Sequence, residues 1–316
     1  MPPSSFGAGF YPQPNEWTCG PVALKHALLA LGRTVDVVRL RDTAKTHWWS
    51  GTNEVQMTRA ARAVGCDLVL HRRTDPESAR KMLVSHLRAR TPVLLCVEEW
   101  SHWVTVFRVE DGRFVVADST DDPTLSLRTW SQMWRWWRYR EPATEGAPSR
   151  TLYDLMAVVP HVQTRVRADL SVRRVRYLRR PENRGLAHHW DEYLQDLLQI
   201  CRPRASVMAS PVSMGEFLRR HQRLLVERVV HWHGEIAQDD VRKLLRWLRF
   251  VSETYKLVIP AGMTRRALAD LAVLAALYAC ARHGVDGMFG ALGTRARPTP
   301  IPPKPKSRGR SRSKSR

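Results

Sequence analysis

The chain has 316 residues, of which 43% are hydrophobic, and it carries a formal net charge of +21. This length and apolar content support a packed core and leave room for two domains of ordinary size. Its five scattered cysteines form no even framework and no Cys-x-x-Cys pair, which excludes a small disulfide-stapled scaffold and a zinc finger of that pattern.

The positive charge is concentrated in the second half of the chain. Residues 1–160 hold 20 Lys and Arg and 17 Asp and Glu, whereas residues 161–316 hold 31 and 13. A basic half favours an acidic partner, most often nucleic acid or an anionic surface. The first ten residues lack the basic and apolar regions of a secretory signal, so we expect the cytoplasm or another reducing compartment.

The first half reads as helices followed by β-strands. Helical patterns occur at 22–31, 35–46, 54–64 and 76–88, and strand patterns at 67–71, 92–97, 102–109, 113–117 and 152–159. Asp111-Gly112 predicts a tight hairpin between two of these strands. A Trp-rich segment at 127–140 places Trp130, Trp134 and Trp137 at helical spacing, which favours core packing over a platform for stacking bases. This order predicts an α+β domain with an antiparallel sheet over residues 1–160.

The second half is expected to be all-α. Helices are predicted at 186–200, 213–233, 238–257 and 264–283, and together they make a basic helical domain over 161–294. The apolar run 267–281 contains Asp270 and is too short to span a bilayer, so no transmembrane segment is expected. Residues 295–316 are rich in Pro, Lys, Arg and Ser, and such a composition predicts a disordered tail.

Cys19 lies where a loop is predicted to become a helix, in the sequence Thr18-Cys19-Gly20-Pro21. Pro21 suits the first helical turn, because its missing N–H would have no partner there. The free N–H groups of a helix start stabilise an anion, and a thiolate is the nucleophilic form of cysteine. The alternative is a small buried cysteine that only packs at the start of a helix.

A cysteine nucleophile needs a base, an orienting group and donors to the oxyanion. His102 opens one predicted strand and Asp118 follows its hairpin partner, so both lie at the same end of the hairpin. Gln13 precedes Cys19 on the incoming loop, where its amide can join the Cys19 N–H as an oxyanion donor. The alternatives are a core histidine, a turn aspartate and an ordinary loop glutamine.

The motifs Gln-x5-Cys-Gly-Pro and His-Trp-Val-x-Val, followed by an aspartate, occur in this order between Gln13 and Asp118. This pattern resembles the C39-like cysteine peptidases of the papain-like superfamily, over residues 10–160. The resemblance implies a papain-like fold and a catalytic triad of Cys19, His102 and Asp118. It also implies that Gln13 contributes to the oxyanion hole, and that a peptide or isopeptide bond of a peptide or protein substrate is hydrolysed without a cofactor.

The basic tail supports a second hypothesis of a different class. Here the peptidase-like fold is a catalytically silent scaffold, and the chain acts as a nucleic-acid-binding or structural, virion-like protein. The tail residues expected to contact a polyanion are Lys304, Lys306, Arg308, Arg310, Arg312, Lys314 and Arg316. A targeting or solubilising extension remains an alternative for the tail, and a solvated helix face for the arginine pairs at 173–174, 219–220 and 265–266. Pairs such as His188-His189 lack further ligands, so no metal site is expected.

Overall fold

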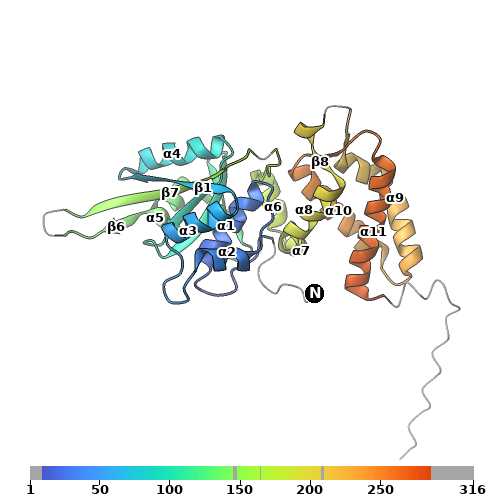
Figure 1. The fold of residues 1–316 in the computed structure, drawn as a ribbon, viewed down its shortest axis with the longest axis horizontal. Helices are drawn as coiled ribbons and strands as arrows, with labels where there is room; N and C mark the ends of the chain where they lie inside the picture. The colour runs from blue at the N-terminus through green and yellow to red at the C-terminus, as the bar shows by residue number, and fades with distance from the viewer. Residues whose placement is uncertain (1–8, 145–147, 164, 208–209, 286–316) are drawn as a thin grey trace, which may run out of the picture.

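The computed structural model describes residues 9–144, 148–163, 165–207 and 210–285. Figure 1 shows a half built around a β-sheet beside a second half made mainly of helices. The helices of the sheet-containing half are α1 (Cys19–Ala30), α2 (Val37–Ala44), α3 (Glu54–Ala63), α4 (Pro76–Arg88) and α5 (Trp130–Trp137). Its strands are β1 (Cys66–Arg73), β2 (Val93–Val97), β3 (His102–Glu110), β4 (Arg113–Ala117), β5 (Leu125–Thr129), β6 (Tyr139–Glu141) and β7 (Arg150–Pro160).

All seven strands of this sheet pair antiparallel, in the order β1-β7-β2-β3-β4-β5, with β6 against β7. The turn between β3 and β4 is Asp111-Gly112, and both residues have positive φ, as a type I′ hairpin requires. The predicted α+β layout and this hairpin are therefore confirmed.

Alternate residues of the central strands face opposite sides of the sheet. Leu94 and Cys96 pack with helices α1 to α3, whereas Val93, Leu95 and Val97 pack with α4 and α5. Trp137 is fully buried in the second of these clusters, with Trp130 and Trp134 packed at its edge. The tryptophan stripe therefore serves as core packing.

The second half consists of short segments followed by three long helices. Its helices are α6 (Val172–Leu178), α7 (Arg184–His188), α8 (Trp190–Ile200), α9 (Met214–His233), α10 (Gln238–Thr254) and α11 (Thr264–His283), with single turns at η1 (Pro181–Asn183) and η2 (Arg204–Ser206). Three very short strands, β8 (Arg202–Pro203), β9 (Val212–Ser213) and β10 (Leu257–Ile259), add a small sheet that the helical pattern did not predict. Among the described residues, no helix has both the length and the apolar character needed to cross a membrane.

The two halves share one hydrophobic cluster. Phe107, Val115 and Leu125 of the large sheet are buried together with residues of α6, α8 and α10. Helix α1 covers this face of the sheet at β3, and the second half covers the same face at β4 and β5. The predicted tail, residues 295–316, lies outside the described residues, so its disorder stays a prediction.

A close contact fixes the start of α1 against the loop before α3. A Cβ atom added to Gly20 would lie 2.9 Å from the Thr52 Cβ and 3.0 Å from the Met57 Sδ. The Trp103 indole Nε1 donates to the Thr52 carbonyl at 2.8 Å, and this hydrogen bond holds the loop in place. Any residue larger than glycine at the second position of α1 would force the Thr52 or Met57 side chain to move.

We expect Gly20→Ala to destabilise the protein by about 1–3 kcal/mol, because it overpacks a rigid contact. The matched control is Gly215→Ala, at the second position of α9. Its new Cβ would meet the Glu253 Oε1 at 2.7 Å and Cγ at 2.9 Å, both atoms of a long, partly exposed side chain that can change rotamer. Urea unfolding measures both variants, and equal losses of stability would contradict this account of the α1 contact.

Candidate active site

Cys19 is the first residue of α1. The Val22 N–H already closes the first helical turn on the Thr18 carbonyl at 3.1 Å, whereas the Cys19 N–H is too near the helix start to have an intrahelical acceptor. The Cys19 side chain is only 5% exposed. A nearly covered thiol therefore lies next to a free N–H at the positive end of a helix dipole.

The hairpin register brings His102 to Asp118, as predicted. Thr105 of β3 pairs with Ala117 of β4, so the first residue of β3 and the residue after β4 lie at one end of the hairpin. The His102 Nε2 is 2.8 Å from the Asp118 Oδ1, and both side chains are buried. Since Asp118 engages Nε2, the ring nitrogen left for the Cys19 thiol is Nδ1.

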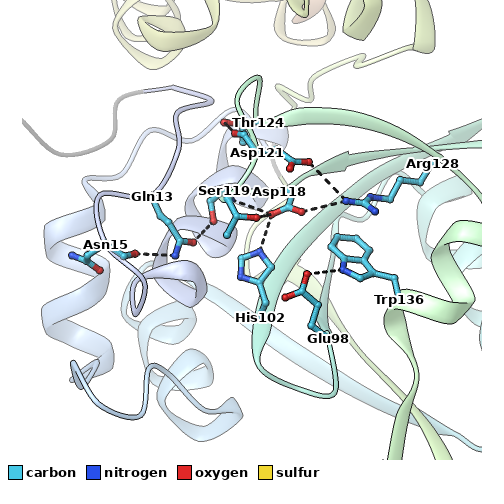
Figure 2. A network of polar contacts seen from close by, with 11 residues as sticks. Gln13, Asn15, Glu98, His102, Asp118, Ser119, Asp121, Thr124, Arg128 and Trp136 are labelled. Atoms are coloured by element: carbon cyan, nitrogen blue, oxygen red, sulfur yellow. Dashed lines mark hydrogen bonds and ion pairs between the residues drawn. The ribbon is translucent and has the colours of Figure 1, made fainter.

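Asp118 is held by a network that Figure 2 shows from close by. Its Oδ1 also accepts the Thr120 N–H at 3.1 Å and the Thr120 hydroxyl at 2.8 Å. Its Oδ2 lies 3.4 Å from Arg128 Nη2, and the Arg128 guanidinium stacks 3.7 Å from the Trp136 ring centroid. These contacts fix the carboxylate and with it the imidazole plane.

The sequence pattern did not predict that Arg128 and Thr120 belong to the site. It predicts residue 128 within the Trp-rich helical segment, whereas in the structure this residue lies in β5 and pairs with Phe114. The sequence Asp118-Ser119-Thr120 does carry a local signal, because an aspartate followed two residues later by a free N–H forms an Asx turn.

The pKa values of the pair move in opposite directions. Burial alone lowers the pKa of His102, but hydrogen bonds from its ring to Asp118 and Cys19, together with their charges, outweigh burial and raise that pKa to about 9. Burial raises the pKa of Asp118, whereas its hydrogen bonds to His102 and Thr120 win and lower it. At neutral pH the pair is therefore an imidazolium held by a carboxylate.

Gln13 is tied to the loop that follows Asp118. Its N–H donates to the Ser119 carbonyl at 2.8 Å, and its Oε1 accepts the Ser119 hydroxyl at 2.6 Å. Its Nε2 donates to the Asn15 carbonyl at 2.8 Å, so one of the two amide hydrogens is already used. The second hydrogen is the only one left for an oxyanion, and this role of Gln13 stays a prediction.

The other cysteines differ from Cys19 in their surroundings. None of the five, which all lie in the described residues, forms a disulfide, and burial raises the pKa of the Cys66, Cys96 and Cys201 thiols. Within the described ranges, no group of three or more His, Cys, Asp or Glu side chains is placed to hold a metal ion. The one cysteine beside a histidine–carboxylate pair at a helix start is therefore Cys19.

No protein-family model and no curated protein matches this sequence. Among solved structures, the peptidase domain of Streptococcus ComA, a bi-functional ABC transporter involved in quorum sensing, is similar at 14% identity and a TM-score of 0.36, over 48% of this chain and 96% of that domain. A double glycine motif protease from an AMS/PCAT transporter, solved with its leader peptide, is similar at 15% identity and a TM-score of 0.36, over 50% and 96%. The peptidase domain of Streptococcus mutans ComA gives 14% and 0.28, over 46% and 96%. These are C39 peptidase domains, the family that the sequence pattern resembles. Since the TM-scores lie below 0.5, the chemistry inferred for this chain rests on its own residues.

Proposed function

We propose that this chain is a cysteine peptidase that hydrolyses a peptide or isopeptide bond with Cys19, His102 and Asp118. The observation that supports it most is the buried 2.8 Å contact between His102 Nε2 and Asp118 Oδ1, which leaves the other ring nitrogen for Cys19. An imidazole that only filled space in a core would not need a carboxylate anchored by Thr120 and Arg128.

The mechanism follows from a protonated His102 held beside a negatively charged Asp118. The Cys19 thiolate attacks the carbonyl carbon of the scissile bond, and the Cys19 N–H and the Gln13 amide stabilise the oxyanion. His102 then gives its proton to the leaving amine, and a thioester remains on Cys19. Water attacks the thioester while His102 takes a proton from it. The carboxylic acid leaves, and the Cys19–His102 ion pair is restored.

The silent-scaffold hypothesis shares this geometry but predicts no turnover. Replacing Cys19 separates the two hypotheses only if the wild-type chain is active, so activity is sought first. A quenched-fluorescent peptide library supplies substrates of many sequences, and a wild-type chain that cleaves none of them favours the scaffold.

Cys19→Ala is expected to reduce peptide cleavage by about 10³-fold or more, because it removes the nucleophile. It also removes the thioester, which intact-mass spectrometry of an acid-quenched reaction detects on the wild-type chain. Cys280→Ala, which also removes one thiol but on α11, is the control and should keep full activity. Cleavage that survives Cys19→Ala would exclude the mechanism.

The pH dependence of stability in the Asp118→Asn variant tests whether His102 is positively charged in the folded protein. In the folded wild type the pKa of His102 is about 9 against an ordinary 6.5, so His102 stabilises the fold below pH 6.5 and this contribution disappears as pH rises through 9. The Asn variant lacks the carboxylate that raises the pKa. The stability difference between the two proteins, measured by urea unfolding, should therefore be large at about pH 6 and shrink by about pH 9.5. A difference that is constant with pH would contradict the charged pair.

We further propose that the basic tail holds the enzyme near a polyanion. Residues 295–316 contain nine basic and no acidic residues, and such segments bind phosphates through counterion release. Replacing the seven basic residues from Lys304 to Arg316 with serine should weaken binding to an oligonucleotide and flatten its salt dependence, both measured by fluorescence anisotropy. Unchanged affinity and salt dependence would overturn this role of the tail.

A further inference from the structure

The arginines of the second half divide into two classes. Those on the long helices mostly have carboxylate partners one turn away on the same helix. Examples are Arg219 and Arg220, which share Glu216 at 2.7 and 2.6 Å. Such pairs neutralise each other on a solvated helix face, so these residues carry little uncompensated charge.

The segment around α6 is different. It holds Arg173, Arg174, Arg176, Arg179 and Arg180, with no acidic residue between Asp169 and Glu182. Within the part of the chain that the structure describes, Arg173, Arg176 and Arg180 form no ion pair, and all three are exposed. Arg246 on α10 shares both properties. Arg228 on α9 and Arg265 on α11 also have no ion pair among the described residues, but the α6 segment gathers five arginines within eight positions.

A cavity of about 460 Å³ opens beside these residues. Four arginines, two aromatic rings and two carboxylates line it, among them Arg173 and Arg174 of α6 and Arg246 and Arg249 of α10. The Tyr177 and Phe250 rings stack with their centroids 4.6 Å apart, and both belong to the lining. The two carboxylates are already engaged, Asp169 by Arg108 and Glu253 by Arg249, so the net character of the cavity is basic.

Arg174 forms no ion pair among the described residues, although two carboxylates line the same cavity. Its guanidinium lies 5.2 Å from the Phe250 ring centroid and donates to the neutral Thr254 hydroxyl at 3.1 Å. Burial lowers the pKa of Arg174, and the charges of Asp169 and Glu253 offset this only in part. A half-buried cation with a neutral hydrogen-bond partner gains from an incoming anion.

We propose that this cavity, the α6–α10 basic groove, binds the phosphodiester backbone of a nucleic acid strand. Arg173 and Arg246 contact phosphates from the two walls, and Arg174 reaches them from within. The inference rests on the proposed polyanion partner and gives that partner a second binding site. The residues of this site are separate from both the tail and the Cys19 site.

The spacing of the arginines favours a strand over a single phosphate group. Arg173 and Arg176 are neighbours on the same face of α6, and Arg180 continues the basic run to lie 5.8 Å from the Tyr177 ring centroid. Phosphates recur along a nucleic acid strand, so a strand can engage the whole row of arginines on α6, whereas a single phosphate group would engage only part of the row. Aromatic rings next to arginines are also typical of surfaces that bind single strands.

The test uses the full chain and a fluorescein-labelled single-stranded DNA of about 20 nucleotides. Arg173→Gln with Arg246→Gln should weaken binding about tenfold or more near 0.1 M salt, and reduce the salt slope by about 1.4, because each phosphate contact contributes about 0.7. Arg219→Gln with Arg220→Gln removes the same charge from an ion-paired face, and should change affinity by less than about threefold. Equal losses in the two double variants would overturn the groove.

A local readout separates the groove from the tail. Phenylglyoxal modifies arginines, and mass spectrometry maps each site with and without the DNA. We expect the DNA to protect Arg173 and Arg246 but not Arg219 or Arg220, and to do so also in the chain whose tail residues are serine. Protection that is absent in both chains would overturn the groove. If tail replacement leaves affinity unchanged while Arg173 and Arg246 are protected, the role of the tail fails and the groove stands.

Discussion

The hydrogen bond between His102 and Asp118 depends on the geometry of one hairpin. The Asp111-Gly112 turn sets the pairing of β3 with β4 next to the loop, and an irregularity between Val106 and Arg108 then shifts the register by one residue before the far end. Any further shift of one residue would turn every side chain of the paired segment to the opposite face of the sheet. It would separate the imidazole from its carboxylate, so the turn, the register and the candidate chemistry form one constraint.

The helix that carries Cys19 is held from both sides. On the sheet side, the Thr105 hydroxyl donates to the Ala23 carbonyl at 2.6 Å. On the other side, the Tyr255 hydroxyl donates to the Leu29 carbonyl at 2.9 Å, and Lys25 pairs with Asp191 at 3.2 Å in a nearly buried contact. All the proposed catalytic groups precede Pro160, but residues of the second half help to position the helix on which the nucleophile lies.

The sequence predicted the elements that carry strong local signals. The hairpin dipeptide, the glycine and proline after Cys19, and the apolar periodicity of α9, α10 and α11 identified their elements to within a few residues. It missed β5 and β6, because short strands beside a tryptophan-rich helix carry no pattern of their own. For the same reason it missed Arg128, whose role depends on a strand pairing. The carboxylate partner of Arg219 lies one turn away in the sequence, but the cavity between α6 and α10 could not be predicted, because it depends on how these two helices pack.

The central claim is that Cys19, His102 and Asp118 form one charged unit. Nitrogen-15 NMR of the His102 ring tests it most directly, because the chemical shifts report whether one or both ring nitrogens carry a proton. The account predicts that the wild-type ring is doubly protonated at neutral pH and titrates near pH 9, and that in Cys19→Ala its pKa falls. A His102 ring that is neutral at neutral pH in the wild type, or whose pKa is indifferent to Cys19, would contradict the account.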